Sequence, residues 1–160
     1  MLPKIRILLL DSDPSIRTLL RLVVGATSDM EMLEATTDIA QLPRLCIEFV
    51  PHIFLIGNSN KTFVIDNLLV LREHTPHTRT IILLSPDTHR LTDLLDLPIH
   101  GSCVKAEIDE TLVHILRAVA GGATSFSRRA IEEQFAANID RAIAELDAHL
   151  TPSERRVLAL

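Results

Sequence analysis

Short apolar runs alternate along this chain with longer segments in which apolar residues recur every three or four positions. A short, bounded apolar run predicts a strand, whereas the longer spacing predicts an amphipathic helix. Residues that favour turns, such as Gly, Pro, Asp and Ser, separate the two kinds of segment. Strands are predicted at residues 5–10, 31–35, 52–56, 81–84 and 102–104.

The first predicted helix has clear start and stop signals. Asp13 can cap it, Pro14 suits its first turn, and Gly25 ends it. The fifth helix is closed by Gly121 and Gly122, because glycine readily terminates a helix. Following the five strands in turn, helices are predicted at residues 14–25, 42–50, 63–73, 91–97 and 108–119.

Five strand-then-helix units predict an α/β fold with a doubly wound parallel sheet. Parallel neighbours need a crossover between them, and right-handed crossovers place helices on both faces. In such a sheet, ligands collect at the carboxyl ends of the strands. Those ends carry Asp11, Ser12 and Asp13, then Gly57, Asn58 and Ser59, then Ser85, and finally Lys105.

This set of strand-end residues resembles that of the receiver domains of two-component response regulators, over residues 1–122. Receivers carry an acidic pair after the first strand, a phosphoacceptor Asp ending the third, Ser or Thr ending the fourth and Lys ending the fifth. The carboxylates hold magnesium against the phosphoryl group, the hydroxyl contacts the new phosphate, and the lysine neutralises it. Asp11, Ser85 and Lys105 match. The resemblance implies a flavodoxin-like, five-stranded parallel sheet in the order 2-1-3-4-5.

Three other positions depart from the receiver pattern. Ser12 stands where the main metal-binding acid belongs, and Ser102 replaces an aromatic residue that reports phosphorylation in the family. Gly57 takes the phosphoacceptor position, and a slip of one residue would offer Asn58, which is not a carboxylate either. Glycine has no group that could form an acyl phosphate. We therefore expect a domain that is not an enzyme, needs no cofactor, holds no metal beyond weak binding at Asp11, and accepts no phosphoryl group.

Several of these residues also have simpler interpretations. Asp13 is more readily a helix cap than a metal ligand. Asp11 and Lys105 can form an ion pair across the strand ends, and Ser85 can start a turn. Gly57 can be a loop glycine that needs a permissive backbone. A second functional hypothesis is a sensor that binds a small anion or ligand in the vestigial phosphate pocket formed by Asp11, Ser12, Gly57, Asn58, Ser85 and Lys105.

A further helix is predicted at residues 127–150, with one apolar stripe among mixed charges. Such a stripe either docks on the domain or pairs with a second chain, and we favour pairing. Residues 123–150 are therefore interpreted as a linker helix and dimerisation segment. The stripe consists of Ile131, Phe135, Ile139, Ile143, Leu146 and Leu150.

Residues 151–160 begin one more helix, in which Thr151 can cap, Pro152 suits the first turn and Glu154 completes a capping box. This stretch resembles the opening of the helix-turn-helix domain that follows receivers in LuxR-type transcriptional regulators, and less closely the last DNA-reading region of sigma factors. The resemblance implies the regulatory domain of a transcription factor, acting as a homodimer or through a protein partner. DNA would be contacted only by the missing C-terminal domain.

Composition narrows the function classes further. The chain has a net charge of -5 and only 3% aromatic residues, which suits neither a surface that tracks phosphates nor one that stacks bases. No apolar run reaches the roughly 18 residues of a membrane span. Cys46 and Cys103 lie far apart among apolar residues, which predicts two reduced, buried thiols. We expect a cytoplasmic protein with no membrane contact.

Overall fold

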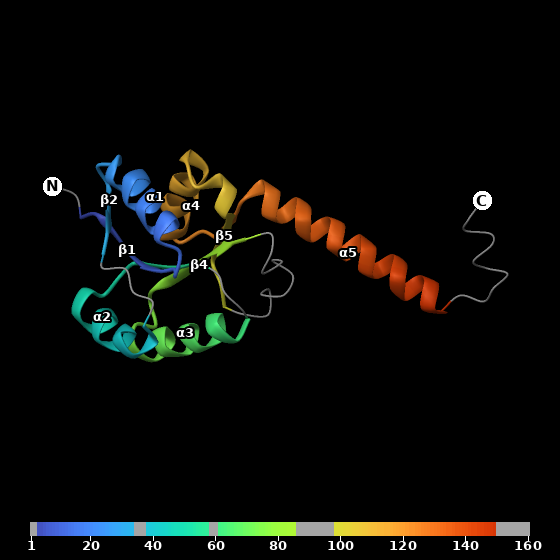
Figure 1. Cartoon of the computed structure of the whole chain (residues 1–160), viewed down its shortest axis with the longest axis horizontal. Coiled ribbons are helices and arrows are strands. Elements are labelled where there is room, and N and C mark those ends of the chain that lie inside the picture. The colour runs from blue at the N-terminus through green and yellow to red at the C-terminus, as the bar shows by residue number, and fades with distance from the viewer. Residues whose placement is uncertain (1–2, 34–37, 58–60, 86–97, 150–160) are drawn as a thin grey trace.

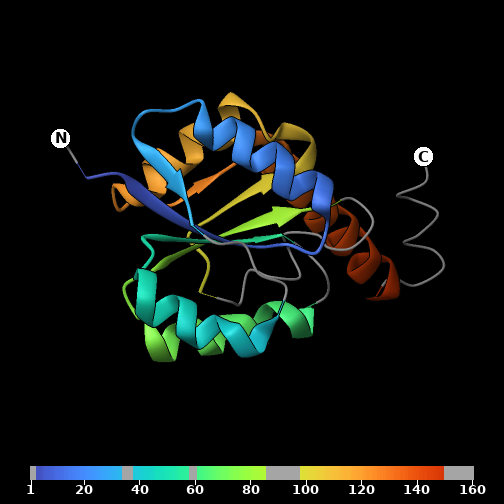
Figure 2. The same cartoon turned by 60° about the vertical axis from the view of Figure 1, so that its left-hand side comes forward.

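The computed structural model describes residues 3–33, 38–57, 61–85 and 98–149. Its strands form one parallel six-stranded sheet in the order β2-β1-β3-β4-β5-β6, with helices on both faces (Figures 1 and 2). The first five strands follow the predicted order. The strands are β1 (Ile5–Leu10), β2 (Met30–Met32), β3 (Ile53–Gly57), β4 (Arg79–Leu84), β5 (Gly101–Val104) and β6 (Ser125–Phe126). The α-helices are α1 (Pro14–Gly25), α2 (Leu42–Phe49), α3 (Lys61–His74), α4 (Glu110–Ala120) and α5 (Arg128–His149).

Two aliphatic layers join the helices to the sheet. In Figure 2, α1 and α4 cover one face of the sheet, and α2 and α3 cover the other. Side chains of a strand alternate between the two faces, so Leu8 of β1 joins the layer under α2 and α3, whereas Leu9 joins the layer under α1 and α4. Both are fully buried. Burial on both faces explains why these strands are apolar at nearly every position.

Some predicted boundaries shift in the structure. The third strand ends at Gly57 rather than before it, so this glycine belongs to the sheet. α4 begins at Glu110 rather than at residue 108 because Asp109 caps it, its carboxylate accepting the Thr111 backbone N–H at 2.8 Å. The helix predicted at 91–97 lies outside the described residues. Within the described segments, no helix is long and apolar enough to cross a membrane.

A sixth strand, which the sequence pattern does not predict, joins α5 to the sheet. β6 lies parallel to β5, with Gly101 opposite Ser125. The Ser125 N–H donates to the His100 carbonyl at 3.0 Å. Two residues later, the Ser127 N–H donates to the Ser102 carbonyl at 2.9 Å. α5 begins at the next residue and projects away from the domain (Figure 1), so its first turn is fixed to the edge of the sheet.

Gly101 allows β6 to lie close to β5. A Cβ atom at this position would lie 2.5 Å from the Ser125 carbonyl oxygen and 3.2 Å from Cγ2 of Val119. The carbonyl belongs to the backbone, so a displacement of β6 is needed to relieve the overlap. The junction between the sheet and α5 therefore depends on the missing side chain.

Gly101→Ala should loosen this junction. We expect the free energy of unfolding to fall by about 1–3 kcal/mol, as at other overpacked sites, and the Ser125 and Ser127 amides to exchange faster with solvent. Hydrogen exchange followed by NMR measures both effects. Gly25→Ala is the matched control, because a Cβ atom there meets nothing within 4 Å. Unchanged protection of the two amides in Gly101→Ala would contradict the expectation.

Candidate functional site

Asp11 and Lys105 form a buried ion pair at the carboxyl edge of the sheet. Asp11 follows β1 directly and is 1% exposed, while the Lys105 side chain, just after β5, is 16% exposed. Lys105 Nζ lies 3.1 Å from Asp11 Oδ2, which confirms the expected pair. Oδ1 accepts the Asp13 backbone N–H at 2.8 Å. Among the described residues, no donor is aligned for a hydrogen bond with Oδ2, so the ammonium compensates that oxygen by charge rather than by directed bonding.

The Asp11 carboxylate fills the space beside Gly57. A Cβ atom at Gly57 would overlap the Asp11 carboxylate and would lie 2.9 Å from Asp11 Cβ. Gly57 is buried in β3. Its φ lies outside the left-handed region; among the described glycines, Gly122 is the one with a positive φ. The interpretation as a loop glycine with a permissive backbone is therefore wrong. Glycine fits here because the Asp11 side chain, in this position, occupies the space that a side chain at residue 57 would take.

The other predicted site residues have different positions and exposures. Asp13 is a helix cap, as expected, with Oδ1 accepting the Ser15 N–H at 2.8 Å. Ser12 is exposed, and Ser85 is half-buried after β4. Ser102, by contrast, is completely buried within β5. Asn58 lies outside the described residues. Asp11, Gly57 and Lys105 lie side by side at this edge of the sheet.

Comparison with known proteins identifies the fold. No family model matches the chain. The chain is 28% identical over 163 residues to the transcriptional regulatory protein MctR of Rhizobium johnstonii. The alignment covers 99% of this chain and 73% of MctR.

Two similar solved structures are a LuxR-family two-component response regulator from Aurantimonas sp. SI85-9A1 and the isolated receiver domain of RcsB from Salmonella enterica serovar Typhimurium. The first has a TM-score of 0.71 at 19% identity, covering 85% of this chain and 99% of that one. The second has a TM-score of 0.67 at 16% identity, covering 83% and 99%. A third similar structure contains two RcsB dimers bound to two parallel DNAs. It has a TM-score of 0.70 at 18% identity, covering 81% of this chain and 67% of that one. The chain has the fold of a response-regulator receiver domain.

The residues present do not suit the magnesium ion that the receiver fold implies. Magnesium is bound through carboxylates and water in near-octahedral geometry. Here Asp11 already faces the Lys105 ammonium, Asp13 caps α1, and the intervening position is a serine. Among the described residues, no group of three or more His, Cys, Asp or Glu side chains could hold a metal ion.

Neither cysteine of this receiver-fold domain can supply a nucleophile in place of the missing carboxylate. Burial, assisted by the Glu107 and Asp109 carboxylates, raises the pKa of the Cys103 thiol to about 12. Burial also raises the pKa of Cys46, although a hydrogen bond with Thr75 acts in the opposite direction. Because the thiolate is the reactive form, both thiols are inert at neutral pH. Both cysteines are free and buried, as predicted.

A double-mutant cycle tests whether Gly57 and Asp11 share one space. Gly57→Ala alone should lower the free energy of unfolding by about 3 kcal/mol, because it displaces Asp11 from Lys105. In an Asp11→Ala background, the same substitution should cost less than about 1 kcal/mol, since the overlap is gone. Urea denaturation of the four proteins measures the coupling. Additive effects of the two substitutions would refute the shared space.

Proposed function

We propose that this domain is the regulatory domain of a transcriptional regulator and that it works without phosphorylation. The observation that carries the proposal is the Asp11 carboxylate beside Gly57. On the receiver pattern, Gly57 stands at the acceptor position, and it offers no oxygen for an acyl phosphate. The space for an acceptor side chain is taken by Asp11, whose charge Lys105 already balances.

Asp11 is itself a poor substitute acceptor. Its side chain is almost fully buried, and its two oxygens face the Asp13 amide and the Lys105 ammonium. A phosphoryl donor would need to displace these partners and to do so without the usual second metal-binding acid. The same arrangement gives less support to an anion sensor in the vestigial pocket, because the Asp11 carboxylate would repel an anion approaching Lys105.

The role in transcription is supported by the likeness to MctR, which extends over nearly all of this chain. The isolated RcsB receiver domain and the LuxR-family response regulator from Aurantimonas share this fold, which supports a receiver-type regulatory domain. We place DNA contact in a C-terminal domain that residues 151–160 would begin. The net charge of -5 supports a regulatory role for the present residues rather than contact with phosphates.

Phosphorylation independence can be tested by mass. The full chain is incubated with magnesium and a small acyl phosphate donor, and the intact protein is weighed before and after treatment with hydroxylamine, which removes acyl phosphates. We expect no added phosphoryl group. An adduct that hydroxylamine removes would overturn this part of the proposal. Asp11→Asn then serves as the matched variant, because loss of the adduct in it would place the phosphoryl group on Asp11.

The apolar stripe of α5 supports dimerisation with a second copy. α5 extends beyond the sheet (Figure 1). Large apolar side chains on it are exposed to solvent. Ile139 is 44% exposed and Ile143 is 59% exposed. Ile139 and Leu146 are seven residues apart, as in the seam of a paired helix. The described members of the stripe are Ile131, Ile139, Ile143 and Leu146, and the Phe135 side chain lies outside the description.

Replacing Ile139 and Ile143 by Ser together should weaken self-association at least about tenfold, because burial of each apolar side chain contributes roughly 1.5–3 kcal/mol. Sedimentation equilibrium over a range of concentrations measures the dissociation constant. Leu69→Ser is the control, since Leu69 is 59% exposed but lies on α3. A wild-type chain that stays monomeric at all concentrations, or equal weakening by Leu69→Ser, would contradict pairing through α5.

A further inference from the structure

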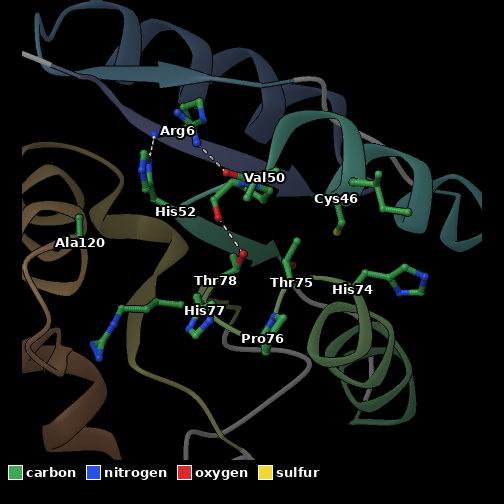
Figure 3. Close-up of a pocket in the computed structure, with 13 residues that line it drawn as sticks. Arg6, Cys46, Val50, His52, His74, Thr75, Pro76, His77, Thr78 and Ala120 are labelled. Atoms are coloured by element: carbon green, nitrogen blue, oxygen red, sulfur yellow. Dashed lines mark hydrogen bonds between the residues drawn. The ribbon is translucent and has the colours of Figure 1, made fainter.

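An open groove lies at the amino edge of the sheet, opposite the Asp11 site. It has a volume of about 560 Å³ and lies between the start of β1, the end of α2 and the turn between α3 and β4. Figure 3 shows its lining side chains. The volume is in the range of about 300–1,000 Å³ that is usual for small-molecule sites.

The groove is basic in an acidic chain. Two Arg and three His are among the thirteen described residues that line it, and none of the thirteen is Asp or Glu. The chain as a whole has 21 acidic residues against 16 Lys and Arg. The basic side chains come from separate elements: Arg6 from β1, His77 from the turn after α3, and Arg79 from β4. Because all three line the same groove, and both arginines carry positive charge, the local potential favours an anion.

Hydrogen bonds from Arg6 fix the backbone at the apolar end of α2, which forms one wall of the groove. Ile47 is 65% exposed and Val50 is 55% exposed, so both present carbon surface to water. Val50 has a φ of 43°, a left-handed conformation that a β-branched residue rarely adopts. Arg6 supports it by donating from its guanidinium to the Val50 carbonyl at 2.9 Å and to the Phe49 carbonyl at 3.2 Å. The wall is thus formed before any ligand arrives.

His52 presents a hydrogen-bond donor at this groove. Its Nδ1 accepts the Arg6 backbone N–H at 2.9 Å, so in the neutral ring Nε2 carries the proton. Burial and the nearby Arg6 guanidinium lower the pKa of His52, while the Glu31 carboxylate acts in the opposite direction. The ring is therefore mainly neutral at pH 7, and Nε2–H is a donor.

Arg79 has donors to spare. Within the described part of the chain, its guanidinium makes one long hydrogen bond, 3.5 Å from Nη1 to the Ala123 carbonyl oxygen. Arg6, by comparison, uses two of its nitrogens to cap α2. His77 is exposed beside Arg79 in the turn that leads into β4. Arg79 and His77 can therefore meet an anionic group without loss of structural bonds.

We propose that this groove binds a small organic anion with an apolar body, such as an aryl-substituted carboxylate. Arg79, His77 and the His52 N–H contact the charged end, and Ile47, Val50 and Pro51 cover the apolar part. The proposal is independent of phosphorylation at the other edge of the sheet.

The test uses the full chain and two probes with the same phenyl-substituted four-carbon skeleton, 4-phenylbutanoate, which ends in a charged carboxylate, and 4-phenylbutan-1-ol, which ends in a neutral hydroxyl. NMR titration should give saturable shifts at the amides of His52, Thr78 and Arg79 with the carboxylate. The alcohol should bind at least about tenfold more weakly, because it lacks the charge that strengthens hydrogen bonds to Arg79. Absence of saturation with the carboxylate, or equal binding of the two probes, would overturn the proposal.

Matched variants locate the site. Arg79→Gln should weaken carboxylate binding at least about fivefold through loss of a charged partner, and Ile47→Ser should weaken the binding of both probes. Arg21→Gln removes the same charge from the exposed face of α1 and should change nothing. Equal weakening by Arg79→Gln and Arg21→Gln would show attraction to net charge alone and would refute a site in the groove.

Discussion

The ion pair between Asp11 and Lys105 ties together the carboxyl ends of three strands. Asp11 follows β1, Lys105 follows β5, and the carboxylate lies over Gly57 at the end of β3. Buried charges are costly unless they compensate each other, and here they do so at 3.1 Å. Each charge is compensated by the other within the chain. At the sheet edge that carries phosphate chemistry in receiver domains, the charge of Lys105 is therefore balanced by Asp11 of the same chain.

Much of this arrangement was accessible from the sequence because its signals are local. Strands buried on both faces must be apolar throughout, and Asp13 before Pro14 is a strong helix start. The positions of Asp11 and Lys105 at the ends of their strands also follow from the pattern. Their pairing could be expected because carboxyl ends of parallel strands meet at one edge.

Other features depend on contacts that no local pattern records. β6 has two residues, Ser125 and Phe126, which is too short for a periodic signal. The role of Gly57 is apparent only from the direction of the Asp11 side chain. The basic groove joins Arg6, His52 and Arg79, which are distant in sequence and adjacent only through strand register. At two places an imidazole nitrogen, rather than a backbone carbonyl, accepts a hydrogen bond from a strand amide. Nδ1 of His52 accepts from the Arg6 N–H, and Nδ1 of His100 accepts from the Thr80 N–H at 3.0 Å.

The attachment of α5 through β6 gives that helix the properties of a lever arm. At a rise of 1.5 Å per residue, its 22 residues extend about 33 Å. A tilt of about 10° where Ser127 meets the sheet would therefore move the far end by about 6 Å, by the same geometry. A small rearrangement of β5 is thus magnified along the helix, and whatever is joined beyond His149 would be displaced by a distance comparable to one helical turn.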